Sequence, residues 1–112
     1  MASKPFKRSS VHWVDLDPTR RRELKKTRPA VIVSQDALNE ALDTVVICPL
    51  TRTLHPAWRT RLQIGRNNNL SEIAIDQIRV VSKDRLIPGK IGELSPKEQA
   101  ALRDLLSEAY AQ

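Results

Sequence analysis

Short apolar runs alternate with polar stretches along this chain, and most of the runs have the length of a β-strand. They are rich in β-branched and aromatic residues, which favour strands. We predict four strands from them, at residues 11–16, 29–34, 44–51 and 58–64. Residues 71–86, "SEIAIDQIRVVSKDRL", predict a fifth extended segment with a break near Gln77. Turn residues are concentrated in "NNN" (67–69) and "IPGKIG" (87–92).

Two segments carry helix signals instead. "SQDALNEALD" (34–43) predicts a short helix capped by Ser34 or Asp36. The C-terminal segment has Ser95 as N-cap and Glu98 in the position that completes a capping box. One face of this second helix is apolar, and it is formed by Ala101, Leu102, Leu105, Leu106 and Ala109.

Helices do not alternate regularly with the strands, so a parallel doubly wound sheet is disfavoured. The pattern favours a mainly β (α+β) fold: an antiparallel sheet curled into a small barrel, with the C-terminal helix closing one end and a short inserted helix. A chain of 112 residues has the size of one domain. We predict a flexible basic tail at residues 1–10 and a single domain at residues 11–112.

Composition and charge indicate a class of binding partner. The net charge is +6, and the excess lies in the first half, since residues 1–61 carry 12 Lys/Arg against 6 Asp/Glu while the rest carry 7 of each. This asymmetry indicates a surface for a polyanion, because phosphate contacts gain affinity by releasing counterions. A basic surface that merely aids solubility is the alternative.

Several site classes are disfavoured by the residues present. Two histidines, one cysteine and no CxxC or HExxH spacing leave no evident metal site, and no glycine-rich phosphate loop exists. Cys48 lies in an apolar run and is expected in the core, and His12 is expected to be a structural side chain of the first strand. No apolar run has the length of a membrane span and no signal peptide is evident, so we expect a cytoplasmic protein that needs no cofactor.

The candidate chemistry gathers in four stretches. "VDLDPTRRRELKKTRPAVIV" (14–33) places six basic side chains and Glu23 between two predicted strands, and "PLTRT" (49–53), "HPAWRTR" (55–61) and "AIDQ" (74–77) follow. A basic and aromatic combination is typical of single-strand binders. The residues that we assign to RNA binding are Arg20, Arg21, Arg22, Lys25, Lys26, Arg52, His55, Trp58, Arg59 and Gln77.

These stretches, in this order and spacing and followed by an amphipathic helix, resemble the MazF/PemK (Kid) family of toxin endoribonucleases. The resemblance covers residues 11 to about 110. It implies a small SH3-like barrel that forms a homodimer, cuts single-stranded RNA without a metal and is neutralised by a cognate antitoxin. The family's catalytic residues correspond to Arg28, Thr51, Glu23 and Asp76.

Two of these four residues have side chains that suit the chemistry of RNA cleavage. Attack by the 2′-hydroxyl needs a base, neutralisation of charge at the phosphorane, and a proton for the leaving 5′ oxygen. The planar donor fork of Arg28 matches two phosphate oxygens, and the Thr51 hydroxyl can add a hydrogen bond. Glu23 is the candidate base by resemblance alone.

Each assignment has a structural alternative. Arg28 also fits a surface arginine at the start of a strand, and Thr51 fits a turn residue. Asp76 can pair with a loop arginine, Glu23 can balance neighbouring charges, and Trp58 can anchor the core. The function itself has two alternatives: a non-enzymatic inhibitor of a protein such as a topoisomerase, and a basic RNA-binding module.

The chain also departs from the family. Three arginines, at positions 20–22, stand in the loop where many members have glycine, and Ala74 stands where one branch has an arginine. A mechanism that uses the latter arginine as acid cannot operate here unchanged.

Overall fold

The computed structural model of the chain describes residues 6–16, 27–66 and 69–111. The strands are β1 (Ser10–Asp15), β2 (Thr27–Ile32), β3 (Thr44–Thr51), β4 (Arg61–Arg66), β5 (Asn69–Ala74), β6 (Arg79–Ser82) and β7 (Gly92–Glu93). The helices are α1 (Asp36–Ala41) and α2 (Pro96–Tyr110), with short 3-10 turns η1 (Ile75–Gln77) and η2 (Lys83–Arg85).

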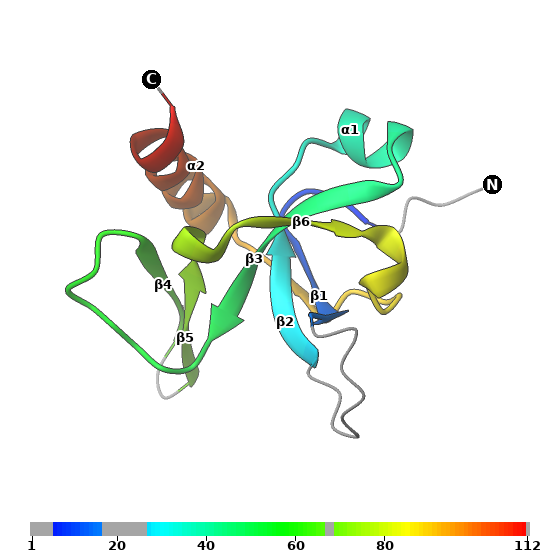
Figure 1. Cartoon of the computed structure of the whole chain (residues 1–112). Helices are drawn as coiled ribbons and strands as arrows, with labels where there is room; N and C mark the ends of the chain where they lie inside the picture. The colour runs from blue at the N-terminus through cyan, green and yellow to red at the C-terminus, as the bar shows by residue number, and fades with distance from the viewer. Residues whose placement is uncertain (1–5, 17–26, 67–68, 112) are drawn as a thin grey trace.

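The strands pair antiparallel in the order β4-β5-β3-β2-β1-β7. β3 is central, because its first half pairs with β6 and its second half with β5, while β2 pairs along its other edge. The sheet therefore divides at β3 and curls into a half-barrel, with α2 beside β4 and β5 and α1 above β6 (Figure 1). This architecture confirms the predicted fold class.

The two faces of the sheet carry separate cores. The first core contains Val11, Val31, Cys48, Leu50, Ile73, Ile75, Leu94 and Leu102. The second core contains Val14, Ala30, Ile32, Val45, Ile47, Val81 and Leu86. Alternation along β1, β2 and β3 sends successive side chains to opposite cores, as the sequence pattern predicts.

Cys48 and His12 are both buried, which confirms that they are structural. Burial raises the pKa of the Cys48 thiol to about 12, with a smaller contribution from the charge of Asp76, so this thiol is not a nucleophile at neutral pH. Burial lowers the pKa of His12, whose ring is 3.1 Å from the Ser10 hydroxyl and meets the Phe6 ring edge-on. Neither side chain is available for chemistry.

Helix α2 begins as predicted. The Ser95 side chain accepts a hydrogen bond from the Glu98 N–H, and the Glu98 side chain accepts one from the Ser95 N–H. Leu102, Leu105 and Leu106 pack on the first core. The apolar face of the helix therefore covers its own sheet.

The shorter helix and the fourth strand differ from their predicted starts. α1 has Gln35 as its N-cap, and the predicted caps bind elsewhere: the Ser34 hydroxyl accepts the Val46 N–H at 3.0 Å, and the Asp36 carboxylate accepts the Arg8 N–H at 2.7 Å. β4 begins at Arg61, so residues 58–60 belong to a loop. The predicted break near Gln77 is confirmed as η1.

Residues of the barrel begin earlier than the predicted boundary at residue 11. Phe6 packs against the second core, and β1 already starts at Ser10. Residues 6–10 thus belong to the barrel rather than to a tail, whereas residues 1–5 lie outside the described residues. No helix within the described ranges is long and apolar enough to cross a membrane.

Candidate functional site

An open groove of about 890 Å³ runs across one end of the half-barrel, and we call it the main groove. Arg28, Thr51 and Arg52 line it, together with apolar side chains that include Trp13, Leu50 and Ile64. Two of the four predicted catalytic residues thus share one surface. Its mixture of cations, a hydroxyl and apolar floor fits a ligand that presents both phosphates and bases.

The pairing of β2 with β3 brings Arg28 and Thr51 together. Ala30 pairs with Pro49 in this antiparallel ladder, and each of the two candidates lies two residues further toward the same end. Residues two apart on a strand face the same side, so both side chains leave the sheet on one face. Arg28 is exposed, which leaves its guanidinium free to meet an anion.

Gly65 forms a tight part of the groove floor. Its φ of +102° is unfavourable for other residues, and a Cβ at this position would lie 2.2 Å from the backbone oxygen of Asn69. Next to it, Arg52 donates a hydrogen bond to the Asn69 side chain at 3.2 Å. The β4–β5 hairpin therefore keeps its backbone close to the groove and fixes Arg52 at the rim.

The loop between β3 and β4, residues 52–60, carries most of the other described candidates. The His55 ring stacks on the Trp58 ring with centroids 3.9 Å apart and planes 8° apart. The indole is still 47% exposed, and Arg59 is exposed beside it. Trp58 is therefore not the core anchor that was the alternative.

Asp76 does not line the main groove. It lies in η1, where its Oδ1 accepts hydrogen bonds from Arg61 Nε at 2.9 Å and from the Thr60 hydroxyl at 3.0 Å. Burial would raise the pKa of this carboxyl, but the bonds from Arg61 and Thr60 outweigh it and the pKa is lowered. The carboxylate thus pairs with an arginine next to the 52–60 loop, which is the kind of contact that the structural alternative predicts, and Gln77 is exposed next to it.

The remaining predicted residues lie outside the described ranges. They are Arg20, Arg21, Arg22, Glu23, Lys25 and Lys26, and their roles stay predictions.

Sequence reasoning missed Trp13, Arg61 and Glu72. Trp13 lines the main groove and is 41% exposed, and the sequence pattern indicated no role for it beyond its strand. Glu72 is 1% exposed although it alternates with Ile73, which predicts a solvent position. The only sequence signal for it was an acid between apolar strand residues, and the loop that covers it cannot be placed from the sequence.

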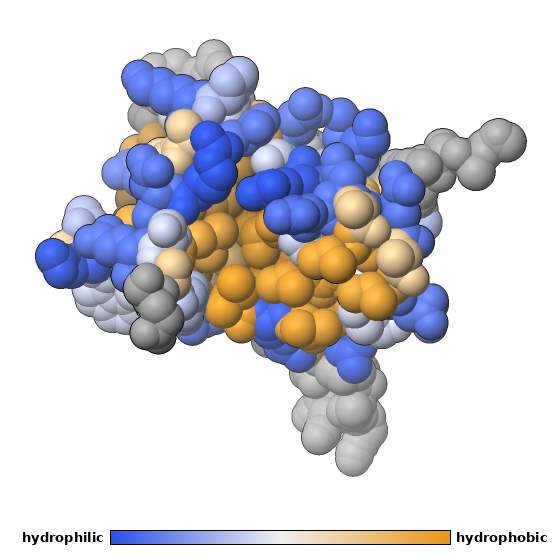
Figure 2. Space-filling view, turned by 90° about the horizontal axis from the view of Figure 1, so that it is seen from above, coloured by the Kyte–Doolittle hydropathy of each residue, from blue (hydrophilic) through white to orange (hydrophobic). Residues whose placement is uncertain are grey.

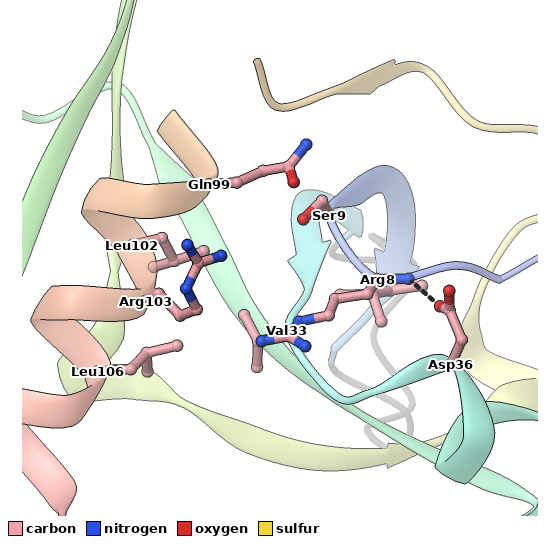
Figure 3. Close-up of a pocket in the computed structure, with 9 residues that line it drawn as sticks. Arg8, Ser9, Val33, Asp36, Gln99, Leu102, Arg103 and Leu106 are labelled. Atoms are coloured by element: carbon pink, nitrogen blue, oxygen red, sulfur yellow. Dashed lines mark hydrogen bonds between the residues drawn. The ribbon is translucent and has the colours of Figure 1, made fainter. Parts of the chain in front are cut away.

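A second hollow, of about 230 Å³, lies between α2 and the segment that joins β2 to α1. Figure 3 shows Arg8 extending across it toward α2, where Arg103, Leu102 and Leu106 form the opposite wall. None of its lining residues is shared with the main groove. It contains no predicted catalytic residue, so the main groove is the stronger candidate site.

A metal centre has no evident ligand set in the part of the chain that the structure describes. No group of three or more His, Cys, Asp or Glu side chains lies close enough to hold an ion there. The groove instead offers a guanidinium for charge neutralisation.

Comparisons with known proteins identify the family and agree with this fold. The family model described as "PemK-like, MazF-like toxin of type II toxin-antitoxin system" matches residues 7–110. Endoribonuclease MazF9 of Mycobacterium tuberculosis is 28% identical over 110 residues, which cover 90% of this chain and 92% of that protein.

Solved structures of other proteins have folds similar to that of this chain. A mycobacterial endoribonuclease in complex with its cognate antitoxin has a TM-score of 0.74 at 25% identity, covering 96% of this chain and 94% of that one. A MazE-MazF structure from Deinococcus radiodurans has a TM-score of 0.79 at 17% identity, covers 96% of both chains and supports the fold alone. The chain belongs to the PemK-like, MazF-like toxins of type II toxin-antitoxin systems, a family that includes endoribonucleases.

Proposed function

We propose that this toxin is a metal-independent endoribonuclease that cuts single-stranded mRNA at preferred sequences, and thereby inhibits translation and growth. The observation that carries the proposal is the convergence of Arg28 and Thr51 on the main groove. The names of the relatives support the same reaction class. The products are a 2′,3′-cyclic phosphate and a 5′-hydroxyl.

The reaction uses the RNA's own 2′-hydroxyl as nucleophile. It loses its proton to the base and attacks the adjacent phosphorus, which gives a pentacoordinate intermediate with extra negative charge. The bond to the 5′ oxygen then breaks, and this oxygen takes a proton from water to become the 5′-hydroxyl. Arg28 neutralises that charge with two parallel N–H donors. The Thr51 Oγ1 already accepts the Thr53 N–H at 3.1 Å, so the hydrogen of this hydroxyl is available to donate to a phosphate oxygen.

RNA binding extends from the groove to the 52–60 loop. Arg52 lies at the rim, and Arg59 with the exposed edge of the His55–Trp58 stack continues the surface. Single strands bind such surfaces through backbone phosphates and stacked bases. The arginines at 20–22 and the lysines at 25 and 26 are proposed to add phosphate contacts, and Glu23 is proposed as the base.

Two protein partners complete the proposal. A cognate antitoxin neutralises the toxin, by analogy with the mycobacterial complex. A second copy of the chain forms a homodimer, and exposed apolar side chains support this: Leu38 on α1 and Leu42 at its C-cap are each 48% exposed, and Val80 on β6 is 61% exposed. Figure 2 shows an apolar area on this face of the molecule. The site of action is the cytoplasm, where mRNA is found.

Incubation with an end-labelled pool of single-stranded RNA in EDTA tests the activity. We expect discrete cuts whose downstream fragments accept phosphate from polynucleotide kinase without prior treatment, because their 5′ ends are hydroxyls. Arg28→Ala protein from the same purification excludes a contaminating nuclease. Binding without cuts would indicate the RNA-binding module, and neither binding nor cuts would favour the inhibitor of a protein target.

A further inference from the structure

A buried carboxylate lies on the strand next to Thr51. Glu72 on β5 pairs in register with Thr51 on β3, so the two side chains leave the sheet on the same face. The Glu72 side chain is only 2% exposed. A carboxylate removed from water is costly unless each oxygen is compensated, so its partners should have a specific task.

The partners of Glu72 come from the 52–60 loop and from the start of β4. Its Oε2 accepts the backbone N–H of His55 at 2.8 Å, and its Oε1 accepts Arg61 Nη1 at 3.3 Å. Both bonds reach residues far from Glu72 in the sequence. The carboxylate thus attaches the middle of the loop to the sheet.

Arg61 joins this carboxylate to a second one. Its side chain is 6% exposed, and its Nε donates to Asp76, which also accepts the Thr60 hydroxyl. We call Thr60, Arg61, Glu72 and Asp76 the loop cluster. The Arg61 guanidinium, on β4, thus links the carboxylates of β5 and η1, and Thr60 of the loop bonds to the second of them.

The loop cluster also orients the aromatic pair. The Arg61 guanidinium carbon lies 4.5 Å from the centroid of the Trp58 ring, and His55, whose N–H binds Glu72, stacks on the same indole. The backbone N–H of Trp58 donates to the His55 carbonyl at 2.9 Å. Release of the Glu72 carboxylate would therefore free both rings at once.

We propose that Glu72 is a positioning residue that holds the 52–60 loop in the shape that binds single-stranded RNA, with Arg61 as the bridge and Asp76 as the outer support. Glu72 touches no substrate. It acts through the loop that follows Thr51, whose hydroxyl accepts the Thr53 N–H at the loop's first turn. This assigns Asp76 to RNA binding through the loop rather than to the chemical step, and it rests on the proposed function for its kinetic readout.

The main test is Glu72→Gln, which keeps the side chain's shape. His55 and Arg61 donate to different oxygens of the carboxylate, and in the amide one of these two positions is an NH2 donor, so one of the two bonds must break. We expect the KM for a short single-stranded RNA to rise about tenfold while kcat changes little, because a loop that binds without reacting affects ground state and transition state alike. A kcat loss at unchanged KM would overturn the assignment.

Asp76→Asn provides a second variant that should fold, because this carboxylate is at the exposed side of the cluster. A positioning role predicts a smaller rise in KM, whereas a catalytic role predicts a fall in kcat alone. Asp104→Asn, an exposed acid on α2, is the matched control and should leave both parameters unchanged.

Hydrogen exchange of the peptide covering residues 53–60 tests the attachment without any RNA. We expect faster exchange of the His55 amide in Glu72→Gln and unchanged exchange in Asp104→Asn. If the wild-type chain cuts no RNA, the proposed function fails while this readout still judges the attachment. Unchanged exchange in a folded Glu72→Gln variant would overturn the inference even if the wild type is active.

Discussion

Arg28 is the residue whose removal we expect to cost the most activity. It supplies the charge that the phosphorane needs, and its exposed position contributes little to either core. Loss of one such donor typically lowers the rate by about 10²–10³. Arg28→Ala should show this loss in single-turnover cleavage of a labelled RNA, with an unchanged melting temperature.

One further variant separates charge from geometry at this position, and a second variant is the control. Arg28→Lys keeps the charge but loses the planar fork, so its rate should lie between those of wild type and Arg28→Ala. Arg103→Ala removes an arginine from the second hollow and should cut at the wild-type rate. If Arg28→Ala cleaves as fast as Arg103→Ala, Arg28 is only a surface charge.

Residues with local signals were predictable, whereas residues defined by distant contacts were not. Arg28 and Thr51 were assigned from the motifs that carry the family resemblance, and in the structure both line the main groove. Glu72 has the pattern of a solvent-facing strand residue, and it is buried because a loop that departs from β3 folds back over it. The alternation of residues within β5 does not show that a loop covers Glu72.

At the scale of the element, the capping box of α2 should determine much of the helix's stability. The Ser95 hydroxyl satisfies the Glu98 N–H, and the helix covers the first core through Leu102. Ser95→Ala should lower the free energy of unfolding by about 1 kcal/mol, measured by urea denaturation.

Ser107→Ala in the same helix is the control for that measurement. Ser107 is exposed near the C-terminal end, and no hydrogen bond of its side chain is needed for the capping box. Alanine is the better helix former there, so this variant should be neutral or slightly more stable. Equal effects of the two substitutions would mean that the cap contributes nothing.

The contrast between the two helices shows why one start was predicted and the other was not. The residues that signal the start of α2 lie within positions 95–98, and they are sufficient by themselves to predict where the helix begins. The Ser34 hydroxyl, by contrast, binds the N–H of Val46, twelve positions away, which removes it from the capping role that its residue type favours. Tertiary contacts override local preference at α1 and at the start of β4.

At the scale of the whole molecule, apolar surface remains uncovered after the chain has folded. The apolar face of α2 packs on the first core, so it does not need a partner. One group of exposed apolar side chains lies on α1, at its C-terminal end and on β6, and Figure 2 shows an apolar area on this face. A second copy that covers this face would also bring two main grooves into one assembly.

Val80→Asp tests this arrangement. Val80 is 61% exposed on β6, so a carboxylate there is solvated in a monomer but would be buried without a partner in the proposed interface. Light scattering at micromolar concentration should give about twice the chain mass of 12.7 kDa for the wild type and a mass near 12.7 kDa for Val80→Asp. Leu54→Asp, on the 52–60 loop, places the same charge outside the proposed interface and should remain dimeric. A wild-type mass near that of one chain, unchanged on concentration, would exclude the dimer, and a dimeric Val80→Asp variant would place the interface elsewhere.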